Sequence, residues 1–364
     1  MNILIVGGAG YIGSMLLYRL IKDGHKVSVY DNLKYGQKSL SRVEYALGSN
    51  KDLNELFSLI PSIFEMDFKI KTKYNYFDLI VGNTFDNKLL ESIFEKKFDF
   101  VFHFGELVGI SICNRNQQFT ENVNFVGTKN VVDLCDKYNS ILIYNSTSSL
   151  YGYQENDKLV DENGEIQKPS DEYCKNKLKV EEYIKSKQNL KSVIFRPSTV
   201  GGLSFRMRME LLPHHFSYAL LVNKKFTLSN SNHYRAIVHI DDLINGYLLV
   251  INNSSKIKDS HYNLYNIGND NLNLTKIQFL NIIKSKLDSS QYDSRYEIAS
   301  KKGTGDMRNL RISSAKFVKD FGYNPTNDFE KIVIPFIDLL KKNPCIFDSY
   351  EHLNEPTLWK GLLE

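Results

Sequence analysis

The chain has 364 residues, of which 42% are hydrophobic and 24% charged, and its formal net charge is +4. This length suits one large α/β domain with an appended lobe, or two domains. Lysines are scattered, not gathered in a stripe, which argues against nucleic acid as a partner. The four cysteines lack metal-like spacing, no apolar run reaches membrane-spanning length, and the first residues enter a core strand directly. We expect a cytoplasmic protein with no metal, nucleic-acid or membrane partner.

The N-terminal residues predict a strand–turn–helix–strand unit that binds a dinucleotide. Its parts are an apolar strand at 2–6, a loop with Gly7, Gly10 and Gly13, a helix over 14–22, and a strand over 26–30 that ends in Asp31. A glycine loop between strand and helix, with an acid about 20 residues further on, is typical of a Rossmann dinucleotide site. A carboxylate at Asp31 accepts hydrogen bonds from the ribose of NAD and repels the extra phosphate of NADP. NAD is therefore the expected cofactor.

Beyond this unit, strands and helices alternate as far as residue 196. The expected strands lie at 77–81, 98–104, 141–144 and 192–195, the expected helices near 87–97, 117–138 and 171–188, and a helix with an insertion of uncertain shape at 34–76. This rhythm predicts a Rossmann-type, doubly wound parallel sheet over 1–196. The glycine- and proline-containing region 197–364 predicts a smaller C-terminal substrate-binding lobe, with 235–250 returning to the Rossmann domain. The cleft between them is the expected ligand site.

Tyr173 and Lys177 stand four residues apart in the expected helix 171–188. That step places both side chains on one helix face, where the ammonium would lower the pKa of the phenol from about 10. A phenol with a lowered pKa can exchange a proton with a substrate hydroxyl while a nicotinamide exchanges the hydride. The spacing alone is common in a lysine-rich chain. Together with the glycine loop, it predicts oxidoreductase chemistry on an alcohol or ketone.

Several motifs, in order along the chain, resemble those of the extended short-chain dehydrogenase/reductases, specifically the nucleotide-sugar epimerase/dehydratase family. They are Gly7-x-x-Gly10-x-x-Gly13, Asp31-Asn32-Leu33, Asn124-Phe125-Val126-Gly127-Thr128, Ser146-Thr147-x-x-x-Tyr151-Gly152, and Arg235-x-x-Val238-His239-Ile240-x-Asp242. The resemblance implies that Thr147, Tyr173 and Lys177 form the catalytic triad. It also implies that Arg235 clamps the substrate diphosphate, a task for which a guanidinium fork is well shaped.

The motifs and strand ends together identify the expected binding residues. For the cofactor these are Gly7, Gly10, Tyr11, Ile12, Gly13, Asp31, Asn32, Asn83, Thr84, Phe104, Gly105, Asn124, Tyr173 and Lys177. For the nucleotide sugar they are Thr199, Arg206, Arg208, Arg235 and Arg308.

The chain departs from the family pattern at several points. Glu106 stands where the family has alanine, which puts a carboxylate near the cofactor diphosphate, and we expect it to point away. The segment Arg196-Pro197-Ser198-Thr199 replaces the usual Arg-x-x-Asn, which alters one substrate contact. Ser148-Ser149 follow Thr147 where 4,6-dehydratases carry Asp-Glu, so dehydration is disfavoured. The runs 107–116 and 205–212 resemble a capsule-sugar branch that includes a GDP-manno-heptose 4-dehydrogenase.

The leading hypothesis is an NAD-dependent enzyme that acts at carbon 4 of a nucleotide-activated sugar, as a 4-epimerase or a 4-dehydrogenase. By resemblance it would be a homodimer that serves surface polysaccharide synthesis. The alternative is a non-catalytic NAD-binding sensor or scaffold on the same fold. The intact set of Thr147, Tyr173 and Lys177 argues against that alternative, because a pure binding protein gains nothing from a tuned phenol.

Overall fold

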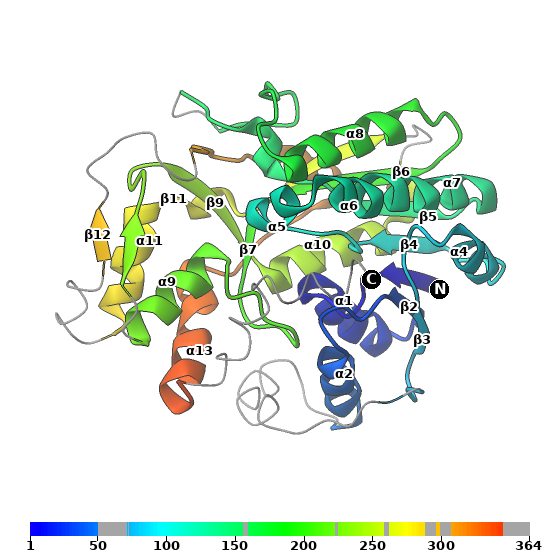
Figure 1. Ribbon diagram of the computed structural model, residues 1–364, viewed down its shortest axis with the longest axis horizontal. Coiled ribbons are helices and arrows are strands. Elements are labelled where there is room, and N and C mark those ends of the chain that lie inside the picture. The colour runs from blue at the N-terminus through cyan, green and yellow to red at the C-terminus, as the bar shows by residue number, and fades with distance from the viewer. Residues whose placement is uncertain are drawn as a thin grey trace.

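A parallel sheet of seven strands, in the order β10-β6-β5-β4-β1-β2-β3, forms the centre of the computed structural model (Figure 1). Its strands are β1 (Asn2–Val6), β2 (Lys26–Asp31), β3 (Asp78–Val81), β4 (Phe100–His103), β5 (Ile141–Asn145), β6 (Ser192–Pro197) and β10 (Asn263–Ile267). The structure describes residues 1–49, 71, 73–155, 159–222, 225–257, 262–287, 296–298 and 307–344. The predicted Rossmann-type fold is confirmed. Most of the predicted insertion, residues 50–70 and 72, lies outside the described residues.

Helices cover both faces of this sheet because its strands are apolar on both sides. In β1, Ile3 and Ile5 pack on one face, whereas Leu4 and Val6 pack on the other. The first face carries α1 (Tyr11–Lys22), α2 (Lys38–Gly48), α10 (Ile240–Asn252) and α12 (Ala315–Phe321). The second carries α4 (Asn87–Phe94), α7 (Thr128–Tyr138) and α8 (Glu172–Ser186). The carboxyl ends of the strands therefore open onto one edge, where the cofactor loop lies.

The helix predicted over 117–138 is interrupted. It consists of α6 (Gln117–Glu121), a π-helical segment η1 (Asn122–Gly127) and α7. Gly127 packs against Thr84 so closely that a Cβ atom would lie 2.1 Å from Thr84 Oγ1. Local π-helical turns often occur at functional sites, and this one places the Asn124 side chain against Leu107, next to the expected catalytic residues. The helix predicted near 87–97 ends at Phe94, and Lys97 has a positive φ of 52°.

The smaller lobe lies beside the carboxyl edge of the main sheet, at the left in Figure 1. Its elements are β7 (Thr199–Gly201), α9 (Leu212–Leu221), β8 (Phe226–Leu228), β9 (Tyr234–His239), β11 (Asn273–Thr275), α11 (Lys276–Ser285), β12 (Tyr296–Ile298) and α13 (Phe329–Lys342). An apolar core formed by α9, α11 and α13, with residues such as Phe216, Phe279 and Val333, holds it together. Short elements near the cleft are α5 (Ile110–Arg115) and the 3-10 turns η2 (Ser148–Tyr151), η3 (Ser254–Lys256) and η4 (Asp270–Leu272).

The chain crosses between the two parts more than once. Residues 235–250, which we predicted to return to the Rossmann domain, comprise most of β9 and α10, and α10 packs against α1. The strand β10 also comes from the C-terminal half of the chain, yet it pairs in parallel with β6 in the main sheet.

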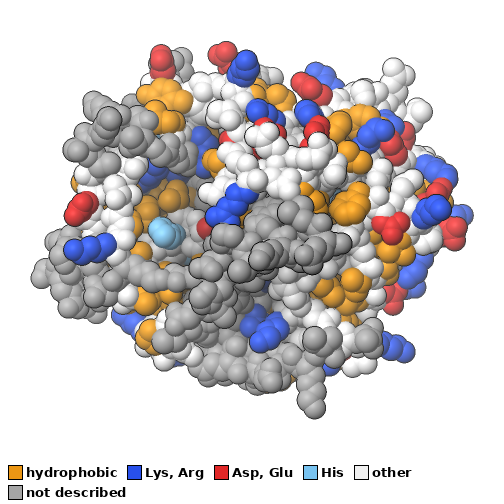
Figure 2. All heavy atoms as spheres, in the orientation of Figure 1, with side chains coloured by type: hydrophobic (Ala, Val, Ile, Leu, Met, Phe, Trp, Pro, Cys, Tyr) orange, Lys and Arg blue, Asp and Glu red, His pale blue; other side chains and the backbone are white. Residues whose placement is uncertain are grey.

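Charged side chains of both signs are interspersed on the face drawn in Figure 2. Among the described residues, no helix combines the length and apolar character that crossing a membrane requires. Within the same residues, no group of three or more His, Cys, Asp or Glu side chains could hold a metal ion.

Candidate active site

The glycine loop between β1 and α1 is shaped so that only glycine fits at two of its positions. Gly7 has a φ of 84°, and a Cβ atom there would lie 2.6 Å from the backbone nitrogen of Gly105. A Cβ on Gly13, in the first turn of α1, would lie 2.3 Å from the carbonyl oxygen of Gly7. The loop thus brings two strand ends and a helix N-terminus together, an arrangement that suits a dinucleotide diphosphate. These residues fit NAD.

A groove runs beside the glycine loop, and we call it the cofactor groove. Asp31, at the end of β2, lines this groove and also supports the glycine loop. Its Oδ2 accepts a hydrogen bond of 2.9 Å from Ala9 N, and its Oδ1 accepts one of 2.8 Å from Leu33 N. Burial raises the pKa of the Asp31 carboxyl, and the two backbone donors partly oppose that effect. The acid is therefore held in a fixed orientation at the place where a ribose is expected.

The far end of the groove is formed by polar residues from three loops. Asn32 Nδ2 donates to Asn83 Oδ1 at 2.9 Å, and both residues line the groove together with Thr84. Arg206 also lines this groove, and its guanidinium carbon lies 4.0 Å from the centroid of the Tyr35 ring. We predicted Arg206 as a substrate residue, but it does not line the neighbouring cavity that holds the catalytic residues. The structure therefore moves Arg206 to the cofactor side.

The three predicted catalytic residues lie together in this neighbouring cavity, which we call the substrate cavity. Thr147 caps the N-terminus of η2, two residues after the end of β5, and its Oγ1 accepts a hydrogen bond from Ser149 N. Tyr173 and Lys177 project from the first turns of α8, whose N-terminus is capped by Asp171. The side chains of Thr147 and Tyr173 are hydrogen-bonded to each other. The structure brings these three residues to one cavity because each follows a strand end or a helix step.

The expected effect of Lys177 on Tyr173 is not found. Burial raises the pKa of Tyr173 well above its usual value, and the hydrogen bond with Thr147 opposes this only in part. The prediction of a lowered pKa is wrong for this structure. The main physical reason is that the phenol is buried, and the nearby Glu106 carboxylate, which is ion-paired with Lys177, raises the pKa further.

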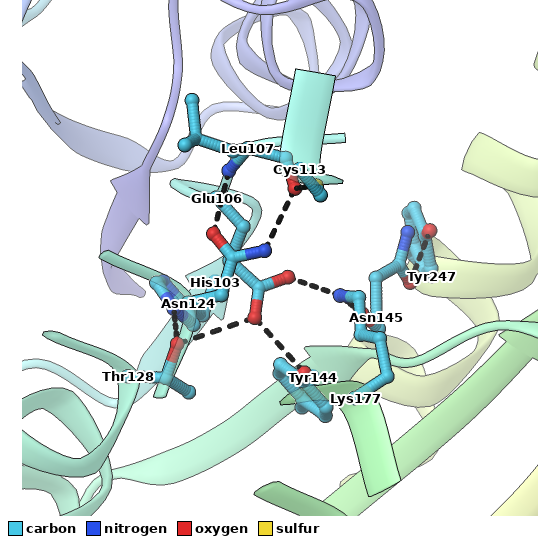
Figure 3. Close-up of polar contacts among 10 residues, drawn as sticks. All are labelled: His103, Glu106, Leu107, Cys113, Asn124, Thr128, Tyr144, Asn145, Lys177 and Tyr247. Carbon is cyan, nitrogen blue, oxygen red and sulfur yellow. Dashed lines mark hydrogen bonds and ion pairs between the residues drawn. The ribbon is translucent and has the colours of Figure 1, made fainter. Parts of the chain in front are cut away.

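Glu106 is the centre of a buried polar network (Figure 3). Its Oε2 forms an ion pair with Lys177 Nζ, and the two side chains are only 2% and 3% exposed. Its Oε1 accepts hydrogen bonds from Tyr144 OH at 2.9 Å and from Thr128 Oγ1 at 3.2 Å. We expected Glu106 to point away from the cofactor diphosphate. Its carboxylate points towards Lys177, Tyr144 and Thr128 in Figure 3, although Glu106 also lines the cofactor groove. Lys177 Nζ also donates to the carbonyl oxygen of Asn145.

Asn124 lies behind this network. Its Oδ1 accepts from Leu107 N and its Nδ2 donates to Leu107 O, both at 2.8 Å. Although we predicted Asn124 as a cofactor residue, it is not among the described residues that line the groove. Its two bonds instead hold the loop that carries Glu106.

The substrate cavity is also lined by basic side chains. Arg308 Nη1 donates to Ser149 Oγ, and Arg235 Nη1 donates to the carbonyl oxygens of Tyr234 and Arg308. Both arginines line the cavity, as does Thr199 at the start of β7. The predicted substrate residues other than Arg206 are thus brought together.

Arg208 lies where the groove and the substrate cavity meet, because it lines both. Its Nε donates to Glu210 Oε1 at 2.7 Å, and the side chains of Arg208 and Glu210 are 18% and 37% exposed. Sequence reasoning missed Glu210 and Tyr35. Opposite charges two residues apart, in the run 206–210, are a signal for the Arg208–Glu210 pair, whereas no sequence signal identifies Tyr35.

Arg196 has a structural role. Its guanidinium binds both carboxylate oxygens of Glu181, at 3.0 and 2.6 Å, and the two side chains are each 3% exposed. This pair fastens β6 to α8, and therefore helps to fix the helix that carries Tyr173 and Lys177.

The chain matches the family model described as "NAD dependent epimerase/dehydratase family" over residues 3–268. It is 30% identical over 290 residues to a dTDP-D-glucose 4,6-dehydratase of Dictyostelium discoideum, a match that covers 74% of this chain and 58% of that protein. The chain thus spans less than two thirds of the length of this relative. It is 24% identical over 360 residues to UDP-glucuronate 4-epimerase 1 of Arabidopsis thaliana, covering 92% of this chain and 76% of that protein.

Solved structures of similar proteins share the fold. A UDP-glucose 4-epimerase of Thermotoga maritima, solved with UDP-glucose, has a TM-score of 0.73 at 22% identity, with 94% of this chain and 100% of that chain covered. A UDP-glucose 4-epimerase of Bifidobacterium longum, solved with NAD+ and UDP, has a TM-score of 0.74 at 19% identity, with coverage of 94% and 99%.

Proposed function

The chain belongs to the NAD-dependent epimerase/dehydratase family, and we propose that it inverts carbon 4 of a nucleotide-activated sugar by oxidation and reduction. It is an enzyme of the extended short-chain dehydrogenase/reductase type, and its cofactor is NAD. The activities of its relatives support the proposal, since they include 4-epimerases that act on UDP-glucuronate, UDP-glucose and UDP-arabinose.

One observation carries the proposal. The substrate cavity is lined by Thr147, Tyr173 and Lys177 and also by the two arginines Arg235 and Arg308, and it shares lining residues with the cofactor groove. The residues that line both are Tyr11, Ile12, Phe104, Glu106, Val108 and Arg208. A sugar with an anionic diphosphate tail matches this arrangement, with the sugar hydroxyl at the triad and the diphosphate at the arginines.

The roles of the triad follow from its contacts. Thr147 hydrogen-bonds Tyr173 and can hold the reacting hydroxyl next to the phenol. Tyr173 exchanges the hydroxyl proton, and Lys177 has an N–H left to contact the cofactor ribose after its bonds to Glu106 and Asn145. Bound NAD supplies the hydride acceptor and donor.

The charges in the substrate cavity disfavour water elimination. Elimination needs an acid and a base beside the ring, and Ser148 and Ser149 occupy the positions where dehydratases carry them. Of the described residues that line the cavity, the carboxylates are Glu106 and Glu210, and each is ion-paired with a basic side chain. Neither is placed to protonate a leaving hydroxyl. This supports epimerisation over dehydration.

A panel of UDP-, GDP-, dTDP- and CDP-sugars carrying deuterium at carbon 4 tests the proposal. We expect one of these sugars to be converted to its C4 epimer with the label retained and with no net change in reduced-cofactor absorbance. A keto product that has lost the label would assign a 4-dehydrogenase instead, the outcome that the runs 107–116 and 205–212 favour by resemblance. A product lighter by one water would contradict the interpretation that Ser148 and Ser149 disfavour dehydration.

We further propose that the product serves surface polysaccharide synthesis and that the enzyme acts as a homodimer. Support for both comes from the same resemblance to the capsule-sugar branch. Sedimentation of the purified protein tests the second statement directly.

A further inference from the structure

The pair formed by Glu106 and Lys177 joins two elements of the site that are far apart in sequence. Glu106 follows β4 and Lys177 lies in α8, 71 positions later. The Asn145 carbonyl, at the end of β5, accepts a second N–H of Lys177. An ammonium has three N–H donors, so these two contacts fix its orientation and leave one donor. The Lys177 side chain therefore has its position set by protein groups.

The Lys177 ammonium lies closer to the ring of Tyr144 than to that of Tyr173. Lys177 Nζ lies 4.6 Å from the centroid of the Tyr144 ring and 5.8 Å from that of Tyr173. Tyr144 in turn donates to Glu106. The lysine is thus drawn into a cluster behind the catalytic phenol, and its charge is cancelled there.

We propose that Glu106 is a positioning residue that neutralises Lys177 and thereby keeps Tyr173 protonated to a higher pH than the lysine alone would allow. The Glu106 carboxylate raises the pKa of Tyr173 in two ways. It cancels the cation that would stabilise the phenolate, and its own negative charge disfavours a second negative charge nearby.

The other ionisable groups around the pair leave this charge balance intact. They are His103 in β4, Cys113 in α5, Tyr144 in β5, Asp171 and Cys174 at the start of α8, Glu181 further along α8, and Arg208 with Glu210 before α9. The histidine and both thiols are neutral, because burial lowers the pKa of His103 to about 3 and raises the pKa of each cysteine to about 12. Arg208 is paired with Glu210, Glu181 with Arg196, and Asp171 caps α8.

The rate of tyrosine nitration by tetranitromethane measures the proposed effect without substrate or cofactor. The reagent attacks the phenolate, so at a fixed pH below the pKa the rate follows the ionised fraction. Tyr173 lines the substrate cavity and is accessible from it. Its nitration is read by peptide mass spectrometry, with Tyr76, which is 44% exposed, as the internal standard.

We expect Glu106→Gln to speed nitration of Tyr173 at pH 8 by about tenfold, which corresponds to a pKa lower by about one unit. Lys177→Met should slow it, because the carboxylate then faces the phenol alone. The double variant, with both charges removed, should return close to the parent rate. A mere loosening of the packing would speed nitration in all three, so the opposite signs distinguish charge from structure.

Two further variants serve as controls. Glu106→Asp keeps the charge and should stay near the parent rate. Glu121→Gln breaks the exposed ion pair with Lys179 of α8 and should leave the nitration of Tyr173 unchanged. Removing one partner of a buried pair destabilises a protein far more than removing both. The double variant and Glu106→Asp therefore still test the proposal if Glu106→Gln does not fold. A nitration rate of Tyr173 in the double variant that is tenfold lower or higher than in the parent would overturn the proposal.

This inference rests on the proposed role of Tyr173, but the experiments distinguish a failure of the inference from a failure of the proposed function. A parent-like nitration rate in Glu106→Gln overturns the inference whatever the enzyme's substrate. If no nucleotide sugar is converted but the nitration pattern is as expected, the proposed function fails and the charge balance stands. In an active enzyme, Glu106→Gln should also shift the acidic limb of the kcat/KM profile to lower pH by about one unit.

Discussion

Replacing Gly13 by alanine tests the geometry of the cofactor loop. Gly13 lies in the first turn of α1, where alanine is favoured over glycine by about 1 kcal/mol on helix propensity alone. The structure predicts that Gly13→Ala instead destabilises the protein. A Cβ atom at this position would lie 2.3 Å from Gly7 O and 2.8 Å from the Cα of Gly8, and both of these are backbone atoms.

The cost follows from the displacement that these contacts demand. An ordinary contact needs about 1 Å more, so either α1 or the loop 7–10 must move. Overpacking of this kind costs about 1–3 kcal/mol, which outweighs the gain in propensity. The same displacement carries the loop away from the place of the NAD diphosphate. We expect a lower thermal unfolding midpoint and an NAD dissociation constant raised at least about tenfold by calorimetry.

Two other helical glycines provide matched controls. Gly48, the last residue of α2, would bring its Cβ only to 3.5 Å from the Tyr76 hydroxyl, so Gly48→Ala should be neutral or stabilising. Gly246 in α10 would meet Ile267 Cδ1 at 2.4 Å, the flexible end of a side chain, so its replacement should cost less than that of Gly13. If Gly13→Ala raises the unfolding midpoint as Gly48→Ala does and binds NAD like the parent, the described loop geometry is wrong.

Three further outcomes are expected. Tyr173→Phe should retain NAD binding and lose turnover by orders of magnitude, since it removes only the proton-transfer group; near-parental kcat would exclude Tyr173 as the acid–base. Arg235→Ala should weaken nucleotide-diphosphate binding roughly ten- to a hundredfold in calorimetry and leave NAD affinity unchanged, because one guanidinium contact is worth about 1.5–3 kcal/mol; an unchanged affinity would place Arg235 outside the site. Burial raises the pKa of Asp241 from 3.8 to about 6, so the folded protein binds this proton more tightly than the unfolded chain does, and stability falls by up to about 3 kcal/mol as pH rises from about 4 to 6. Asp241→Asn should remove that loss, and a gain in unfolding free energy that is equal at pH 4 and pH 7 would contradict the assignment.

Features encoded by local spacing could be predicted from the sequence. The glycine loop, Asp31 and the step from Tyr173 to Lys177 each depend on one strand end or one helix turn, and the structure brings them to one site. The continuous apolar run of β1 likewise indicated a buried parallel strand.

Features that depend on tertiary contacts could not be predicted. The pairing of Glu106 with Lys177 arises only when β4 and α8 are brought together, and nothing local to either residue marks it. The position of Arg206 depends on the path of an irregular loop, in which Arg206 lines only the cofactor groove whereas Arg208 lines both the groove and the substrate cavity. The π-helical turn at 122–127 reflects the close approach of Gly127 to Thr84, again a contact between distant segments.

The interleaved path of the chain has a consequence for how the protein is made. The main sheet receives its last strand, β10, only from residues 263–267, and α1 receives the cover of α10 only from residues 240–252. During synthesis, an emerging chain that ends near residue 196 leaves β6 as an open edge and the apolar side of α1 uncovered, both of which favour aggregation. The cofactor-binding half therefore reaches its final form only when most of the smaller lobe has left the ribosome.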